Sequence, residues 1–181
     1  MRRWNWLMVL GVAVCMSLMI VPSALAERGV TDTEIRIGQY GPQTGPAALW
    51  GAVARGTGCF FDMINAEGGI HGRKIKYFLR DDGYMPPKTK AIVKELVEDK
   101  GIFALASGVG TAPGMAVKKY LEKKKVPWVG PATGSSHWAY PPTKYLWADY
   151  PLYFDEAAIL VRYAVETLGK KKIAFFYQND D

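Results

Sequence analysis

The chain has little cysteine and little histidine. Its 181 residues include two of each, Cys15, Cys59, His71 and His137. Cys15 lies in an amino-terminal segment that we expect to be removed, so Cys59 stands alone and an internal disulfide framework is excluded. The four residues show no metal-ligand spacing with the carboxylates. We therefore expect no metal site and no cofactor.

Two enzyme signatures are absent as well. No Gly-x-Ser-x-Gly elbow is present, which argues against an α/β hydrolase. Residues 108–114 (GVGTAPG) miss the dinucleotide-binding spacing by one residue, and the following strand ends in Gly130-Pro131 without the carboxylate that would hold a ribose. Asp81 and Asp82 are neighbours at a strand end, where side chains point to opposite faces and form a poor acid/base couple. We expect a protein that is not an enzyme; an exported enzyme on a Rossmann-like sheet is the alternative.

The single long apolar run lies at the amino terminus. Arg2 and Arg3 precede apolar residues 7–21, and Ala24-Leu25-Ala26 supplies the small residues of a secretory cleavage site. Residues 1–26 are therefore predicted to be a signal peptide, cleaved after Ala26. The run is short for a membrane span. We expect an exported protein, periplasmic or secreted.

The excess of basic over acidic residues is also small. Without Arg2 and Arg3, the 23 basic residues become 21, against 17 acidic ones, so the mature chain has a net charge of +4. Lysines gather at residues 123–125 and 170–172, just past helical patterns, where cations suit the helix dipole. We therefore expect no nucleic-acid partner.

Short apolar runs alternate with segments of helical periodicity along the mature chain. This order predicts an α/β fold, a Rossmann-like parallel sheet with helices on both faces. Strands are predicted at residues 35–40, 75–79, 102–106, 126–130, 145–148 and 173–177. Helices are predicted at residues 50–67, around 92–97, from 111 onward and around 157–168.

The first predicted helix, residues 50–67, carries an apolar face. We expect that face to be buried; it consists of Val53, Phe60, Met63 and Ile64. Gly56 lies on the same face and predicts close packing on a neighbour, because glycine disfavours helix interiors. Cys59, on the flank of this face, is expected to be a small buried thiol.

The organisation changes after Pro151. The helix and strand beyond it would leave apolar surface exposed if they stood alone, so we expect a second lobe to begin with residues 151–181 and to continue past them. Residues 27–150 then form an incomplete amino-terminal, ligand-binding lobe.

A glycine-rich turn follows the strand at residues 102–106. Gly108 and Gly110 let the backbone approach a bound group, and a helix beginning near Thr111 would direct its free amides at that group. A second glycine-containing loop, residues 131–134, falls at the same carboxyl edge, where open α/β sheets bind ligands. The turn also fits an ordinary strand-to-helix connection with Thr111 as N-cap, and this alternative stays open.

We expect this edge to bind a small molecule without catalytic groups. Backbone amides and the hydroxyls of Thr111 and Thr133 would hold a carboxylate or similar polar head, and Trp50 and Tyr150 would offer flat apolar surface. The alternatives are that Trp50 belongs to the core, that both threonines are helix caps, and that Tyr150 packs at a domain boundary. The candidate ligand-binding residues are Trp50, Gly108, Val109, Gly110, Thr111, Pro131, Ala132, Thr133 and Tyr150.

Five motifs lie in order along residues 33–181. They are residues 41–46 (GPQTGP) followed by Trp50-Gly51, residues 62–73 (DMINAEGGIHGR), Asp81-Asp82, residues 131–133 (PAT) and residues 172–174 (KIA). Together they resemble the branched-chain amino-acid type of periplasmic solute-binding protein. The Ile-Asn-x-x-Gly-Gly-Ile-x-Gly run is the most specific of them.

The resemblance implies two α/β lobes joined by hinge strands, which close on a small-molecule ligand and hand it to an ABC transporter permease. It implies that residues 108–111 and 131–133 hold the ligand's carboxylate, that Trp50 covers its side chain, and that the chain crosses to the second lobe near residues 149–151. The ligand-binding lobe of a sensor has the same fold and is a further alternative.

Two departures from that family bear on the ligand. Its amino-acid binders commonly carry a serine where Gly108 stands and a cysteine pair where Tyr84 and Ser107 stand. The aromatic run at residues 147–153 favours a flatter or more apolar acid. The expected ligand is therefore an amino acid or a related small carboxylate, including an aromatic acid.

Overall fold

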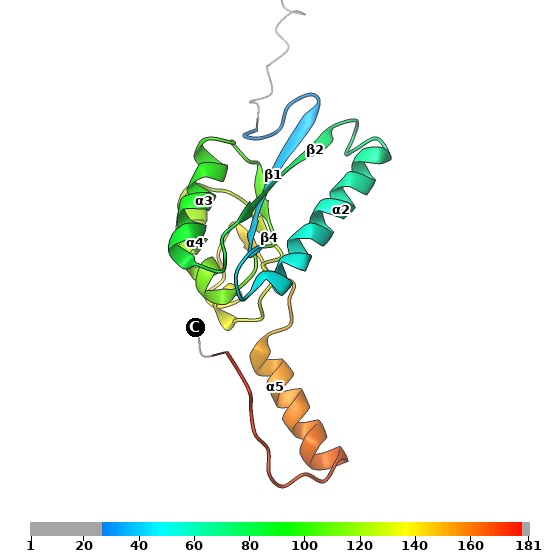
Figure 1. Cartoon of the computed structure of the whole chain (residues 1–181), viewed down its shortest axis with the longest axis vertical. Helices are drawn as coiled ribbons and strands as arrows, with labels where there is room; N and C mark the ends of the chain where they lie inside the picture. Colours follow the sequence, from blue (N-terminus) through cyan, green and yellow to red (C-terminus); the bar gives the residue numbers. More distant parts are fainter. Residues whose placement is uncertain (1–26, 179–181) are drawn as a thin grey trace, which may run out of the picture.

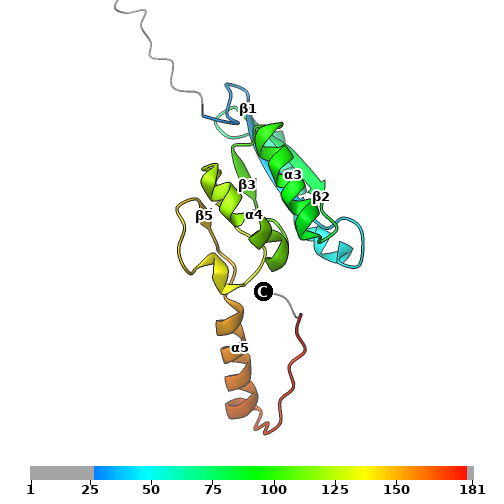
Figure 2. The ribbon, with the colours of Figure 1, turned by 90° about the vertical axis from the view of Figure 1, so that its left-hand side faces the viewer.

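A computed structural model describes residues 27–178, and the predicted signal peptide lies outside the described residues. One sheet of parallel strands organises residues 34–147, in the order β2-β1-β3-β4-β5 (Figures 1 and 2). The strands are β1 (Glu34–Gly41), β2 (Lys74–Asp81), β3 (Ala104–Ala106), β4 (Trp128–Val129) and β5 (Leu146–Trp147). The predicted parallel α/β sheet is confirmed.

Helices cover both faces of this sheet, as predicted. α3 (Pro86–Glu98) and α4 (Thr111–Lys123) lie on one face, and α2 (Ala52–Ala66) lies on the other (Figure 1). Short helical turns precede α2 at η1 (Ala48–Gly51) and follow β4 at η2 (Ser136–Trp138). α5 (Tyr153–Arg162) continues into the π-helical segment η3 (Tyr163–Thr167) and extends away from the sheet (Figure 2).

The hydrophobic core lies between the sheet and the α3 and α4 helices. At its centre, the ring of Trp128 lies 5.2 Å from that of Trp138 and 6.3 Å from that of Tyr40. The core also contains Val93, Leu96, Val97, Ile102, Leu105, Val117, Leu121 and Val126. Gly114 lets α4 approach the two tryptophans, because a Cβ there would lie 2.7 Å from Trp138.

The predicted burial of the α2 face is wrong. Val53, Phe60 and Met63 are 41%, 54% and 48% exposed, and Cys59 is exposed rather than a buried thiol. Ile64 is only partly buried.

α2 meets the sheet through small residues and one aromatic ring. A Cβ at Gly58 would lie 3.2 Å from the Tyr77 ring, and the Tyr77 hydroxyl donates to the carbonyl of buried Ala54 at 2.9 Å. Gly56 has no atom within 4 Å of its Cβ position, so the predicted close packing there is also wrong. The small residues admit the Tyr77 ring, and Phe61 of α2 packs edge-on against the same ring, with centroids 5.4 Å apart.

The predicted strand at residues 173–177 is not formed. Residues 172–178 run back from α5 toward the sheet as irregular chain (Figure 1). A strand needs a neighbour for its backbone hydrogen bonds, and among the described residues no strand of a second sheet lies beside this segment.

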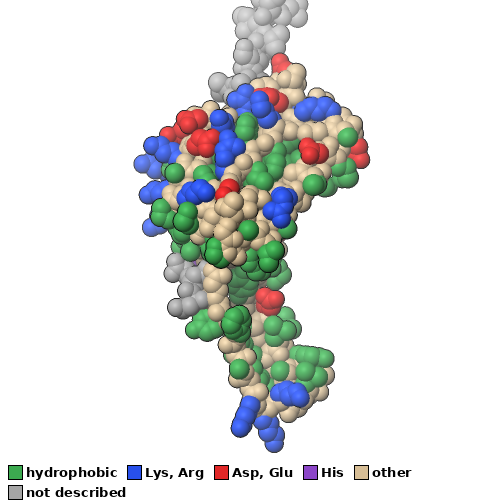
Figure 3. All heavy atoms as spheres, in the orientation of Figure 1, with side chains coloured by type: hydrophobic (Ala, Val, Ile, Leu, Met, Phe, Trp, Pro, Cys, Tyr) green, Lys and Arg blue, Asp and Glu red, His purple; other side chains and the backbone are tan. Residues whose placement is uncertain are grey.

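α5 and η3 have no buried side chain among the described residues. Their exposed apolar side chains gather on the extension in Figure 3 and include Phe154, Ile159, Leu160, Tyr163, Val165 and Leu168. None of the described helices is long and apolar enough to span a membrane.

Candidate functional site

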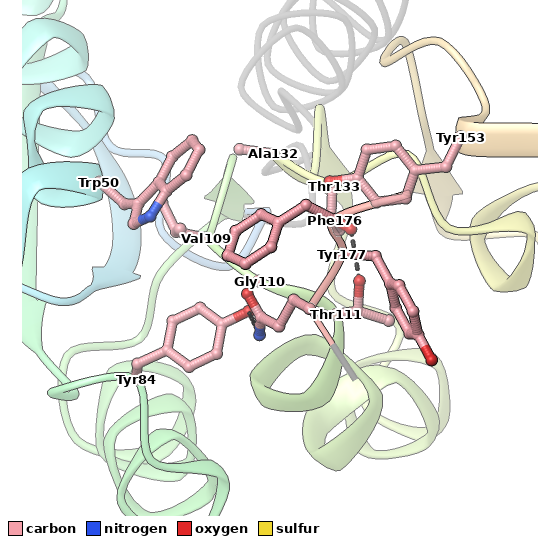
Figure 4. Close-up of a pocket in the computed structure, with 11 residues that line it drawn as sticks. Trp50, Tyr84, Val109, Gly110, Thr111, Ala132, Thr133, Tyr153, Phe176 and Tyr177 are labelled. Carbon is pink, nitrogen blue, oxygen red and sulfur yellow. Dashed lines mark hydrogen bonds between the residues drawn. The ribbon is translucent and has the colours of Figure 1, made fainter. Parts of the chain in front are cut away.

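A pocket of about 500 Å³ opens at the carboxyl edge of the sheet (Figure 4). Its walls come from the segments that follow β1, β2, β3 and β4, together with the start of α5 and the returning residues 176–178. The lining residues are Trp50, Tyr84, Val109, Gly110, Thr111, Ala132, Thr133, Tyr153, Phe176, Tyr177 and Gln178.

The structure brings six of the nine candidate residues into this lining. They are Trp50, Val109, Gly110, Thr111, Ala132 and Thr133. Gly108 and Pro131 are buried behind the pocket, where the Ala132 amide donates to the Gly108 carbonyl at 2.9 Å. Tyr150 lies outside the lining and packs edge-on against Tyr153, with ring centroids 6.2 Å apart.

Sequence reasoning missed five lining residues. Tyr153 belongs to the aromatic run already noted, and residues 176–178 reach the pocket because the predicted strand does not form. No sequence motif around Tyr84 indicated that it would line a pocket. It lies in the turn after β2, and its contribution depends on backbone geometry rather than on spacing.

The start of α4 forms the polar wall of the pocket. The N-cap is Gly110, with φ 99° and ψ 143°, and no side chain caps the helix. The first amides of α4 therefore lack an intrahelical acceptor, as at any helix start, and favour a negatively charged group. The alternative that Thr111 is an ordinary N-cap is wrong, because Thr111 is the first residue of the helix.

Two buried threonines join the loops that follow β3 and β4. The hydroxyls of Thr111 and Thr133 lie 2.5 Å apart and are hydrogen-bonded, and the two residues are 4% and 2% exposed. Each hydroxyl has both donor and acceptor capacity. The pair can therefore present a hydrogen bond to a polar head group at the α4 terminus.

Two tyrosine rings press against the two glycines of the turn. Gly108 and Gly110 have φ of 100° and 99°, which side chains rarely adopt. A Cβ at Gly108 would lie 2.6 Å from the Tyr40 ring, and a Cβ at Gly110 would lie 2.4 Å from the Tyr84 ring. Tyr40 therefore occupies the space that a serine at position 108 would need.

Tyr40 is fully buried, and its hydroxyl has no hydrogen-bond partner among the described residues. Burial raises the pKa of this hydroxyl well above its ordinary value. It therefore stays protonated beneath the turn.

The adjacent carboxylates Asp81 and Asp82 point in different directions, as expected, and each holds one loop. Asp81 accepts hydrogen bonds from the Gln43 amide at 2.8 Å and the Thr44 hydroxyl at 2.6 Å, in the segment that leads to Trp50. Asp82 accepts from the amide of Tyr84 at 3.0 Å. The pair thus organises two aromatic walls of the pocket rather than acid/base chemistry.

These contacts predict opposite pH effects on stability. The hydroxyl of Thr44 and the amide of Gln43 hold the pKa of Asp81 well below its usual range, so Asp81 stabilises the fold above about pH 4 and loses this contribution as the pH falls. Burial raises the pKa of Asp82, which therefore favours the folded state when protonated in acid. Urea unfolding between about pH 2 and 6 is expected to show a shallower acid loss in Asp81→Asn than in the unsubstituted protein.

Asp62→Asn, on the exposed surface of α2, is the matched control, because it removes one carboxylate of a residue outside the Thr44 and Gln43 contacts. Identical profiles for Asp81→Asn and the unsubstituted protein would contradict the role of the Thr44 and Gln43 contacts.

No charged side chain of the described residues lines the pocket, and aromatic rings form much of its wall. Trp50 is 64% exposed and stands at the open side. Among the described residues no cluster of histidine, cysteine and carboxylate side chains is placed to hold a metal ion. The arrangement suits a ligand with a flat apolar body and a polar or anionic head.

Comparison with known proteins identifies the family of this chain. A family model described as periplasmic binding protein matches residues 34–181. The Leu/Ile/Val-binding protein homolog 3 of Brucella melitensis is 34% identical over 103 residues, which cover 56% of this chain and 28% of that protein.

Solved structures share the fold. The fatty acid ABC transporter substrate-binding protein of Thermomonospora curvata superimposes with a TM-score of 0.72 at 27% identity, over 80% of this chain and 36% of that chain. A possible leucine/isoleucine/valine-binding protein of Rhodopirellula baltica gives 0.70 at 23% identity, over 80% and 38%, and supports the fold alone. The matches span less than two fifths of each relative's length. From the family match, the parallel sheet and the pocket at its carboxyl edge, the chain belongs to the periplasmic binding protein family.

Proposed function

We propose that this protein is the exported substrate-binding component of an ABC importer and that it is not an enzyme. It captures an amino acid or a related small carboxylate, including an aromatic acid, between two lobes and delivers it to a permease. The observation that carries this proposal is the uncharged, aromatic pocket at the uncapped start of α4. The names of the relatives refer to branched-chain amino acids and to a fatty acid, which share a carboxylate.

We assign to each site residue a role that its position supports. The α4 amides with the hydroxyls of Thr111 and Thr133 hold the carboxylate, and Trp50 covers the body of the ligand. Val109, Gly110 and Ala132 line the floor. Gly108 and Pro131 shape the two loops from behind, and Tyr150 supports Tyr153 at the border between the lobes.

The division into lobes belongs to the same proposal. Residues 27–150 form the first lobe and residues 151–181 begin the second. The exposed apolar surface of α5 fits this division, because further second-lobe structure would bury it. Closure of the two lobes then encloses the ligand.

Calorimetric titration of the mature protein, in its full natural length, tests this function. We expect binding to at least one of the standard amino acids or of a panel of small carboxylates, and a smaller radius of gyration in X-ray scattering when the ligand is present. Turnover of a small substrate that is lost in His137→Ala would instead favour the enzyme alternative. A membrane span or signalling module after the second lobe would favour the sensor.

Replacing Thr111 by valine is expected to weaken carboxylate binding about tenfold, because a hydrogen bond to a charged group is lost at nearly constant shape. Thr57→Val on α2 is the control, since its hydroxyl bonds to the Val53 carbonyl of its own helix. Equal affinities for Thr111→Val and the control, measured by calorimetry, would remove Thr111 from the site.

A further inference from the structure

We propose that Tyr84 determines the specificity of this pocket, that buried Asp82 holds it in place, and that the pair selects aromatic carboxylates. The inference rests on the proposed function, because it concerns the ligand of the same pocket.

Tyr84 stands where the head of a ligand would be bound. Its ring points into the pocket with the hydroxyl beside Gly110 (Figure 4), and a Cβ at Gly110 would lie 2.8 Å from that hydroxyl. The hydroxyl accepts a hydrogen bond from the Gln178 side chain at 3.0 Å, which shows that it reaches polar groups inside the pocket. A phenol hydroxyl can also donate, and a carboxylate at the α4 terminus is a strong acceptor.

The backbone of Tyr84 adopts an unfavourable conformation. Its φ is 62°, in the left-handed region that bulky residues rarely enter. Such a conformation persists where the surroundings hold it, and it concentrates at ligand sites. An ordinary turn residue at this position would be glycine or asparagine, so a tyrosine here needs contacts that hold its backbone.

Asp82 holds the backbone of Tyr84 in this conformation. Its Oδ1 accepts from the Tyr84 amide at 3.0 Å, and its Oδ2 accepts from the hydroxyl of Thr89 on α3 at 2.7 Å. Asp82 and Thr89 are both 0% exposed. The turn that carries Tyr84 is therefore fastened to α3 by a buried carboxylate, and the ring is aimed at Gly110 before any ligand arrives.

The residues that line the pocket indicate the class of ligand. The side chains that the described residues contribute to the lining are aromatic, aliphatic or polar without charge. The donors of this lining are hydroxyls and the first amides of α4, which favour a negatively charged group. The rings of Trp50, Tyr84 and Tyr153 match a flat body.

Benzoate and its neutral isostere benzamide test the proposal by calorimetry on the mature protein in its full natural length. We expect the unsubstituted protein to bind benzoate at least about tenfold more tightly than benzamide. Tyr84→Phe keeps the ring and removes the hydroxyl. It is expected to weaken benzoate binding about 10- to 100-fold and to change benzamide binding little, so that the benzoate-to-benzamide ratio collapses.

Asp82 variants separate positioning from general stability. Asp82→Ala is expected to lower the same ratio, whereas Asp82→Asn keeps an oxygen for the Tyr84 amide and is expected to preserve it. Tyr120→Phe is the matched control, because Tyr120 lies on α4 with its hydroxyl on Glu98, outside the pocket lining. If Asp82→Ala does not fold, Tyr84→Phe still decides the role of the Tyr84 hydroxyl, and a collapsed ratio in Asp82→Asn would contradict the role given to the Asp82 oxygen.

A ratio unchanged in Tyr84→Phe would overturn the proposal. Binding of L-leucine but of neither aromatic probe would also overturn it and would leave the proposed function standing. Failure to bind any amino acid or carboxylate would overturn both.

Discussion

Replacing Trp128 by alanine is expected to lower the free energy of unfolding by about 3–5 kcal/mol. Trp128 is 1% exposed and lies at the centre of the core, between the rings of Tyr40 and Trp138. Its indole also donates a hydrogen bond to the carbonyl of Ser107, at the start of the glycine turn. The alanine variant therefore loses both a large packing volume and an anchor of the site, and urea denaturation measures the loss.

Trp50→Ala is the matched control for this prediction. Trp50 is 64% exposed, so its removal is expected to change the free energy of unfolding by less than about 1 kcal/mol while it weakens ligand binding. Similar losses of stability in the two variants would show that Trp128 is not the centre of the core.

Replacing Gly108 by serine is expected to destabilise the fold by about 2–4 kcal/mol. Two causes act together at this position. The φ of 100° is strained for any side chain, and the new Cβ would lie 2.6 Å from the Tyr40 ring. Serine is common here in amino-acid binders of the family, so the result would show that Tyr40 and Gly108 are matched in this protein.

Gly68→Ser separates the two causes. Gly68 has a φ of 113° and nothing within 4 Å of its Cβ position, so its serine variant carries the backbone cost without the collision. We expect Gly108→Ser to cost at least about 1 kcal/mol more in urea denaturation, and Tyr40→Ala to reduce the difference in a double-mutant cycle. Equal costs at the two glycines would rule out the collision with Tyr40.

The parallel order of elements and the edge that carries the pocket followed from sequence alone. Alternating strand and helix periodicity leads to a parallel sheet, and the carboxyl ends of parallel strands meet at one edge. Trp50, Thr111 and Thr133, far apart along the chain, therefore came together in the pocket as predicted. Residues in the loops that follow parallel strands meet at this edge because of the order of the strands, and side-chain packing is not needed to predict it.

Tertiary contacts decided which face of α2 meets the sheet. The periodicity of that helix showed an apolar stripe with Phe60 and Met63, yet the sheet is met by Ala54, Gly58 and Phe61. All three contact Tyr77, which belongs to strand β2. Periodicity within one helix carries no information about the partner's shape.

The sequence by itself determined the fold class, the glycine turn at residues 108–110 and the edge of the sheet that carries the pocket, because these depend on local pattern and on chain order. Only the tertiary structure decided that residues 173–177 form no strand, that Tyr40 fills the space beside Gly108, and that Tyr84 forms a wall of the pocket. Each of these depends on a neighbour distant in sequence: a missing strand partner, a ring beneath a glycine, and a buried carboxylate that holds a left-handed residue in place.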